Sequence, residues 1–412
     1  MTIINGLKMN NKLSILLCWL IIGSVTFIPA IKIKEQLPSI QFIDLILPIV
    51  VITLYLNKHL ITWKKLYTTI LIFSGYILFD IVLNNLSSNT NSYFEIYKVL
   101  KFLIIILFFS CLPFNKYFNK VIYPIFYILI IFNTLHFFDF WDFNLIVEQY
   151  YNGGIHIKTF GLNSLGEPAT KRLIGTIGNP NNNAILFLFF TVLLYSKKKK
   201  DYFLIFSIFL SLFFFFLCQS RTAIIALFAI IIIHLIIEFT NEKRTVLSIK
   251  NLIILSVCSL AFLFSNLINK PTYTMSMVKQ NPTQSKSVQG RMEVWGDLLL
   301  MVKEKPIFGY GPNKNYFYQN KIYSESEYIM FIWRYGIVGL LAYILLLIYL
   351  FSVAYNQRLS AEGLLLLQSV VIIGITSLTN NPLSSREISI LWGLIIGSFF
   401  YIKNHNFILD EK

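Results

Sequence analysis

Residues 202–239 have the sequence YFLIFSIFLSLFFFFLCQSRTAIIALFAIIIIHLIIEF. Two apolar runs, at 202–218 and 222–239, lie on either side of the short polar stretch QSR at 219–221. Each run approaches the roughly 20 mainly apolar residues that a helix needs to cross a bilayer. Because a backbone in lipid has to satisfy its polar groups within its own segment, both runs are predicted to be transmembrane helices.

The same pattern extends over the whole chain. Of its 412 residues, 56% are hydrophobic and only 13% are charged, and the mean hydropathy of +0.65 excludes an ordinary soluble protein. On the criterion of roughly 20 mainly apolar residues, we count about twelve candidate spans. They lie near 13–31, 39–56, 66–83, 98–114, 120–138, 183–195, 202–218, 222–239, 251–269, 327–352, 363–378 and 388–402. The predicted fold class is therefore an all-α polytopic membrane protein, with residues 1–412 forming a single integral membrane domain.

The connections between these spans differ in charge, and this difference predicts their orientation. With the N-terminus inside, the inward-facing connections carry clusters of lysine, such as KKKK at 197–200. The short outward connections at 84–95 and 379–387 together hold Arg386 as their only basic residue. The positive-inside rule therefore places both termini in the cytoplasm. The net charge of +15 is mostly cytoplasmic lysine, so no nucleic-acid partner is expected.

The arginines have the opposite distribution. Most of them lie at the predicted outer ends of segments: Arg172, Arg221, Arg291, Arg334 and Arg386. The guanidinium group presents a planar fork of donors and suits phosphate or carboxylate better than an ammonium group does. The sequence therefore predicts that the protein handles an anion at its outer face.

Two connections are long, at 139–182 and 270–326, and both are predicted to be extracytoplasmic. Within the second, apolar residues recur at helical spacing: Met292, Trp295, Leu298, Leu299 and Val302. This spacing predicts an amphipathic helix over 290–302, on the membrane surface or on the bundle. The sequence FGYGP follows at 308–312, and its glycines would let the backbone approach a ligand or another helix. A re-entrant loop that packs on the bundle is the structural alternative.

Four short motifs share the predicted outer face. They are RLIGTIGNPN at 172–181, QSRTA at 219–223, GRMEVW at 290–295 with PIFGYG at 306–311, and EY at 327–328 with YGIVGL at 335–340. In their order and their common side, these motifs resemble those of the polytopic bacterial O-antigen ligase and polysaccharide repeat-unit polymerase family. The fold that this resemblance implies is a GT-C-like helical bundle with two long outer-face loops.

The resemblance implies a glycosyltransferase whose donor is a glycan on undecaprenyl diphosphate, presented at the outer leaflet of the bacterial cytoplasmic (inner) membrane. A polymerase would move the growing glycan onto the terminal sugar of another lipid-linked repeat unit, for capsule, O-antigen or lipopolysaccharide biosynthesis. A ligase would move a finished chain onto another acceptor. The implied partners are the lipid-linked oligosaccharide, membrane lipid, and flippase and chain-length regulator proteins. No cofactor and no metal are expected.

The leaving group of such a transfer is a diphosphate, whose growing negative charge must be stabilised. Arginines are expected to do this, and Arg221 and Arg291 are the catalytic candidates. An interfacial anchor whose charged end reaches the headgroups is the alternative for Arg221. The substrate-binding candidates share the outer face: Arg172, Asn179, Asn181, Trp295, Tyr310 and Arg386. For Asn179, which precedes Pro180, a helix cap is the alternative.

The acceptor hydroxyl has to lose a proton, so a general base would help. Ligases of the family typically carry a histidine just before the last motif, whereas this chain has SESEY at 324–328. Glu327 is the expected base, because partial desolvation beside an apolar helix would increase its proton affinity. Glu325 is the second candidate, and a solvated pair of loop acids is the alternative. The missing histidine favours a polymerase. The alternatives are a ligase, or a flippase or transporter, which should show two similar halves.

Overall fold

A computed structural model of the chain describes residues 11–30, 40–56, 64–145, 171–197, 201–242, 249–268, 286–320 and 324–410. In this part of the chain all the regular elements are helices. The long ones are α1 (Asn11–Phe27), α2 (Phe42–Leu56), α3 (Lys64–Leu83), α4 (Thr90–Ser110), α5 (Phe114–Phe138), α7 (Pro180–Tyr195), α8 (Tyr202–Leu217), α9 (Arg221–Glu242), α10 (Ile249–Ile268), α14 (Glu327–Asn356), α15 (Ala361–Thr376) and α16 (Arg386–Asp410). Each of these helices overlaps one of the ranges predicted to span the membrane, and the all-helical fold class is confirmed.

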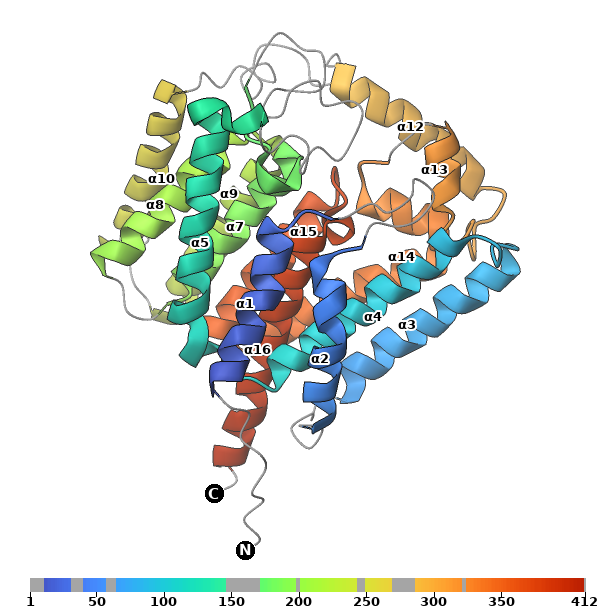
Figure 1. The fold of residues 1–412 in the computed structure, drawn as a ribbon, viewed down its shortest axis with the longest axis horizontal. Coiled ribbons are helices and arrows are strands. Elements are labelled where there is room, and N and C mark those ends of the chain that lie inside the picture. The colour runs from blue at the N-terminus through green and yellow to red at the C-terminus, as the bar shows by residue number, and fades with distance from the viewer. Residues whose placement is uncertain are drawn as a thin grey trace, which may run out of the picture.

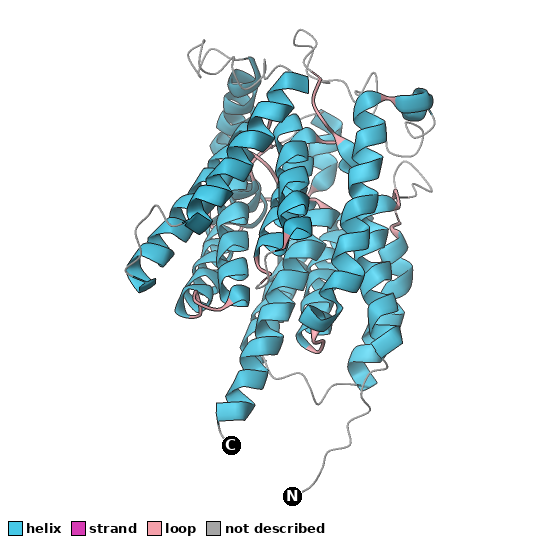
Figure 2. Ribbon diagram, turned by 90° about the vertical axis from the view of Figure 1, so that its left-hand side faces the viewer, coloured by secondary structure: helices cyan, strands magenta, loops and turns pink. Residues whose placement is uncertain are grey.

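Within the described residues, three helices are long and apolar enough to cross a membrane: Phe114–Phe138, Arg221–Thr240 and Glu327–Asn356. Several others are apolar but shorter, among them Pro180–Tyr195 and Ala361–Thr376. Twelve crossings therefore stay a prediction. The long helices form one bundle, and α12 (Lys286–Val302) and α13 (Lys314–Asn320) lie at one end of it (Figure 1). Figure 2 shows the same bundle after a turn of 90°.

Helices α4 and α16 form the most extensive contact among the described helices. Two glycines of α16, four positions apart, make this contact possible. A Cβ atom at Gly397 would lie 2.5 Å from the carbonyl oxygen of Ile106, and one at Gly393 would lie 3.1 Å from Cγ2 of Ile105. Small residues at this spacing let two helix backbones approach closely in a membrane. The close contact holds α16 around Gly393 and Gly397 against residues 102–110 of α4.

Helix α14 is broken at Gly336, whose φ of 60° and ψ of −161° are not helical. The segment 306–311, which contains the predicted glycine turn, lies against this break. Its backbone exchanges hydrogen bonds with α14: Tyr310 N–H with Trp333 O at 2.9 Å, Gly311 N–H with Arg334 O at 2.7 Å, and Ile337 N–H with Pro306 O at 2.9 Å. The glycine turn thus approaches another helix, and the polar groups freed by the break are satisfied within the protein, as a lipid environment requires.

Helix α12 occupies the range in which an amphipathic helix was expected, and it packs against α14. Its buried face is narrower than the predicted apolar face. Leu298 is fully buried and Val302 nearly so, whereas Met292 is 57% exposed and Leu299 41% exposed. Residues 146–170 of the first predicted loop, and 270–285 and 321–323 of the second, lie outside the described residues.

Candidate functional site

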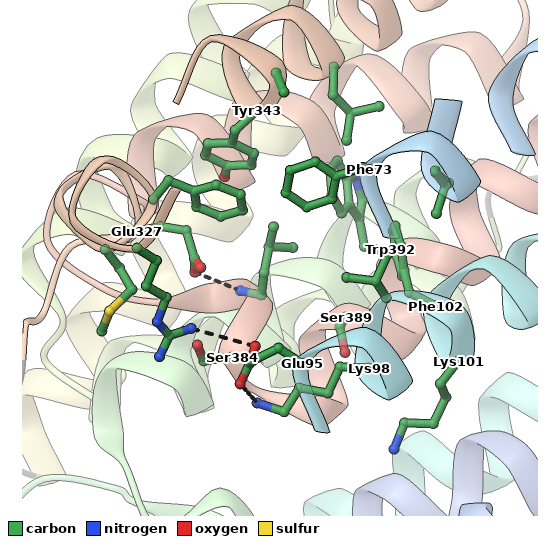
Figure 3. Close-up of a pocket in the computed structure, with 18 of the residues that line it drawn as sticks. Phe73, Glu95, Lys98, Lys101, Phe102, Glu327, Tyr343, Ser384, Ser389 and Trp392 are labelled. Carbon is green, nitrogen blue, oxygen red and sulfur yellow. Dashed lines mark hydrogen bonds and ion pairs between the residues drawn. The ribbon is translucent and has the colours of Figure 1, made fainter. Parts of the chain in front are cut away.

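A cavity of about 200 Å³ lies between α3, α4, α14 and α16 (Figure 3). Its lining includes apolar and aromatic side chains, namely Ile70, Phe73, Phe102, Phe331, Tyr343, Leu346 and Trp392. It also includes charged side chains, namely Glu95, Lys98, Lys101, Glu327, Arg334 and Arg386. Figure 3 shows Phe73 and Tyr343 at one end and Glu95, Lys98 and Lys101 at the other. The lining of the cavity therefore suits an amphipathic ligand, with one apolar part and one charged part.

Glu95 organises the charged end. It is only 8% exposed. Its Oε1 lies 3.0 Å from Lys98 Nζ and 2.8 Å from Lys314 Nζ, and its Oε2 lies 3.5 Å from Arg334 Nη1. Three cations from α4, α13 and α14 thus converge on one carboxylate. Such an excess of cations over a single buried anion favours the binding of a further anion.

Lys314 is the most easily discharged member of this cluster. Burial lowers the pKa of Lys314 to about 8, although the neighbouring Glu95 acts in the opposite direction. An additional anion near the cluster would stabilise the charged form of this lysine. Lys101, in contrast, is paired with Asp44 at 3.0 Å, which anchors it to α2.

Glu327 begins α14 and lines the cavity. Its Oε2 accepts a hydrogen bond from the Leu383 N–H at 3.1 Å, and its own N–H donates to Ser377 O at 3.0 Å and Asn380 O at 3.1 Å. These bonds hold it against the turn between α15 and α16. Since Glu327 is only 4% exposed, it is not a solvated loop acid. A role as the base stays a prediction.

The other catalytic candidates lie around the same turn. Arg291 forms an ion pair with Glu325, two residues before Glu327. Arg221 begins α9, and the adjacent Thr222 hydroxyl is hydrogen-bonded to the Thr379 hydroxyl in the turn. Neither arginine lines the cavity itself, whereas the substrate-binding candidate Arg386 does. The structure thus brings the starts of α9, α14 and α16 together, and places Arg291 beside them.

Three substrate-binding candidates form a separate network at the start of α7. Arg172 is 1% exposed. Its Nε donates to Cys218 O at 3.0 Å, and its Nη2 donates to Asn181 Oδ1 at 2.8 Å. Asn179 caps α7 by accepting hydrogen bonds from the N–H groups of Asn181 and Asn182. This geometry supports the capping alternative for Asn179 and a structural role for Arg172, and substrate contact for these residues stays a prediction.

The two further candidates, Tyr310 and Trp295, lie at the end of the bundle that carries α12 and α13. The Tyr310 ring stacks on Trp333 with centroids 5.3 Å apart, and its hydroxyl lies within hydrogen-bond distance of Met301 O at 3.0 Å and of Glu304 Oε2 at 2.7 Å. Trp295 lies on α12 and is half-buried. Neither side chain lines the cavity, so contact with substrate at these positions also stays a prediction.

The basic residues of α4 were missed because the predicted span began at residue 98 and the preceding connection ended at 95. Helix α4 begins earlier, at Thr90, so Glu95, Lys98 and Lys101 lie in its second, third and fourth turns. The polar residues at 89–92 and Glu95 interrupted the apolar pattern and delayed the predicted start. The available signal was their position near the start of an apolar helix, where ionisable residues are rare and usually functional.

Residues 206–344 match the sequence profile of a protein family described as O-antigen ligase. The matched segment includes Arg221, Arg291, Glu327 and Arg334, while the first motif at 172–181 lies outside it. No curated protein matches the chain. The match confirms the resemblance predicted from the motifs: this multi-pass membrane protein carries, in residues 206–344, the domain of the O-antigen ligase and polymerase family.

Proposed function

We propose that the protein polymerises lipid-linked oligosaccharide repeat units at the outer face of the bacterial cytoplasmic membrane, for capsule or O-antigen. The observation that carries this proposal is the cavity, whose cationic end and aromatic, aliphatic end match the diphosphate and the isoprenoid chain of undecaprenyl diphosphate. The family match supports glycan transfer of the O-antigen ligase or polymerase type. Glu327 lines the cavity and also lies within the segment that matches the family.

The reaction that follows from this arrangement is a single glycosyl transfer. The hydroxyl oxygen of the acceptor sugar attacks the anomeric carbon of the donor glycan, and the bond from that carbon to the lipid diphosphate breaks. The hydroxyl proton passes to the carboxylate of Glu327. The cations around Glu95, with Arg386, stabilise the negative charge that develops on the leaving diphosphate. Arg221 and Arg291, which do not line the cavity, hold the glycan and diphosphate from beside it.

The choice of polymerase over ligase rests on Glu327. The chain has no histidine in residues 290–345, where ligases of this family carry their base. The Glu327 carboxylate lies between the cavity and the turn at 377–385. From there it can take the proton from the hydroxyl of an acceptor that is itself a lipid-linked repeat unit. The second candidate function is ligase-type transfer, which the description of the matched family favours.

The deciding experiment uses the purified full chain and one substrate, an undecaprenyl-diphosphate-linked repeat unit, which serves as both donor and acceptor. A polymerase converts it into a ladder of lengths that a gel resolves. A ligase leaves it unchanged until a second acceptor is added. If the lipid-linked unit crosses the bilayer of proteoliposomes without being consumed, the protein is a transporter and the proposal is wrong.

Arginine variants test the proposed anion contacts in the same assay. Arg386→Ala should reduce ladder formation at least about tenfold, because one charge-assisted contact to the leaving diphosphate is lost. Arg386→Lys should restore little activity if the contact is bidentate. Arg221→Ala and Arg291→Ala should also abolish long products while the protein stays in the membrane. Full-length products from all three alanine variants would remove these residues from the mechanism.

A further inference from the structure

A second cavity, of about 490 Å³, lies at the other end of the bundle from the outer helices α12 and α13. Five helices meet there: α5 and α15 at their first turns, α7 at its last residues, α8 at its cap, and the middle of α16. Figure 1 shows the first turns of α5 at the end of the bundle opposite α12. The two cavities are separate sites, since no residue lines both.

The wall of this second cavity has an apolar part and a polar part. Its floor is apolar and is formed by side chains such as Phe114, Phe118, Leu365, Leu394 and Phe399. Its rim is polar and lies at helix ends, with Asn115, Asn119, Ser196, Lys197, Asp201 and Glu362. Asn115 and Asn119 are exposed, so the rim faces outward. The cavity therefore accepts a molecule with an apolar part and a polar head.

The rim carries both signs of charge. Lys197 supplies one cation, and Asp201 and Glu362 supply two carboxylates. Asp201 Oδ1 already accepts from the Leu204 N–H at 2.8 Å, and Glu362 Oε1 accepts from Asn115 at 2.6 Å. A purely anionic head would meet these two carboxylates, and a purely cationic head would meet Lys197. A zwitterionic head satisfies both signs.

Lys197 is poised for an anionic partner. Its Nζ lies 3.7 Å from the centroid of the Phe118 ring, over the apolar floor. Burial lowers the pKa of Lys197 to about 8, against the effect of Glu362. A second polar group also points to a ligand. The Ser398 hydroxyl lines the cavity, is 93% buried, and has no hydrogen-bond partner among the described residues.

We propose that this cavity binds the headgroup of a zwitterionic aminophospholipid. The phosphate pairs with Lys197, the ammonium group pairs with Glu362 and Asp201, and the proximal part of an acyl chain covers the floor formed by Phe118 and Leu394. The proposal does not depend on the glycan transfer proposed above, because the two cavities share no residue.

The surface beside the cavity gives the acyl chain a path. Tyr123 lines the cavity and contacts Phe203 of α8, with ring centroids 5.2 Å apart. Phe203 and the next apolar residue on the same face, Phe206, are 53% and 52% exposed, and Tyr202 at the helix start is 93% exposed. An aromatic residue so exposed at the end of an apolar helix is typical of the membrane interface. The head of a phospholipid lies at this depth.

Native mass spectrometry of the full chain tests the proposal. The protein is delipidated in mild detergent and re-equilibrated with equal amounts of phosphatidylethanolamine and phosphatidylglycerol. The wild type should retain phosphatidylethanolamine preferentially. Glu362→Gln and Lys197→Gln should each lower this retention at least about fivefold, since each removes a charge-assisted contact. Glu293→Gln, which changes an exposed acid of α12 far from the cavity, should retain the lipid as the wild type does.

A competition measurement needs no variant and stays informative if a substitution impairs folding. Added glycerophosphoethanolamine should displace the bound lipid from the wild type, and glycerophosphoglycerol should not. Equal retention of the two lipids, a preference for phosphatidylglycerol, or unchanged retention in both cavity variants would overturn the proposal. Glycan-transfer activity is not read in either experiment, so a failure here leaves the proposed function untouched.

Discussion

Arg334 Nη1 lies 3.5 Å from Glu95 Oε2, and this ion pair joins α14 to α4 across the charged end of the cavity. Arg334 is two residues before the break in α14, so its direction depends on the backbone contacts of segment 306–311. Glu95 in turn holds Lys98 and Lys314. One buried carboxylate thus fixes cations from three elements before any anion arrives, which lowers the reorganisation needed when a diphosphate binds.

Replacing Glu95 by glutamine should impair both folding and activity. The amide cannot neutralise three converging cations, and breaking a buried ion-pair network by removing one partner costs about 3 kcal/mol or more. We expect a lower melting temperature in detergent and loss of the product ladder. Glu95→Asp keeps the charge and should recover most of the stability. An active and fully stable Glu95→Gln protein would contradict the organising role of this residue.

Substitution of Glu327 by glutamine should remove activity and preserve the fold. Glutamine can still accept the hydrogen bond from the Leu383 N–H, but it cannot take a proton from the acceptor hydroxyl. Loss of a general base typically lowers the rate by about 10² to 10⁴. The matched control is Glu325→Gln, two residues away, which disrupts the pair with Arg291 and leaves the proposed base intact. Equal rates in the two variants would eliminate Glu327 as the base.

The helical framework followed from the apolar runs, because any backbone in lipid must close its own hydrogen bonds. The cap at Asn179 and Pro180 and the glycine turn at 308–312 also followed from local chemistry. The cavity could not be predicted in this way, because it depends on which helices lie side by side. Gly393 and Gly397 bring α16 against α4, and no pattern within either helix predicts that contact.

The charged residues of the cavity differ in the same way: some could be predicted from their local sequence, and others depend on contacts between distant segments. Arg386 and Glu327 were identified by their place at the outer ends of spans. Lys98 and Lys314 gain their roles only through Glu95, which joins segments more than two hundred residues apart in sequence. For Arg172, the position beside a helix start predicted an anion site. The structure adds that its guanidinium bonds the end of α8, and substrate contact there stays a prediction.

Donor binding should weaken at alkaline pH. The lowered pKa of Lys314, about 8, means that this lysine loses its proton as the pH rises through that value, and the cluster loses one positive charge. The affinity for the lipid-linked donor should therefore be constant below pH 7 and fall between pH 7 and 9. Lys314→Arg should remove this dependence, because arginine stays protonated throughout. A wild-type affinity that does not change over this range would exclude Lys314 from donor binding.

Arg172→Ala should lower the stability of the protein. Its guanidinium is buried, and the substitution leaves Cys218 O and Asn181 Oδ1 without their donor, at a cost of about 3 kcal/mol. We expect a clearly lower melting temperature, and turnover per folded molecule close to that of the wild type. Arg386→Ala should differ by losing turnover per folded molecule, although it also lowers stability because the buried Glu387 loses its ion-pair partner. A stable but inactive Arg172→Ala protein would instead support the predicted substrate contact.

Gly336→Ala should prevent the protein from reaching its native structure. The φ of 60° with ψ of −161° is a conformation open to glycine alone, and a Cβ atom would lie 2.1 Å from the carbonyl oxygen of Ile307. The backbone strain costs about 1–3 kcal/mol even before this clash is counted. Gly296→Ala is the matched control. Gly296 lies on an exposed face of α12 with no atom within 4 Å of its Cβ position, so alanine there should stabilise the helix by about 0.5–1 kcal/mol. Protein yield and melting temperature in detergent compare the two variants directly. If Gly336→Ala folds normally and is active, the contact between the glycine turn and α14 cannot be what directs Arg334 toward Glu95.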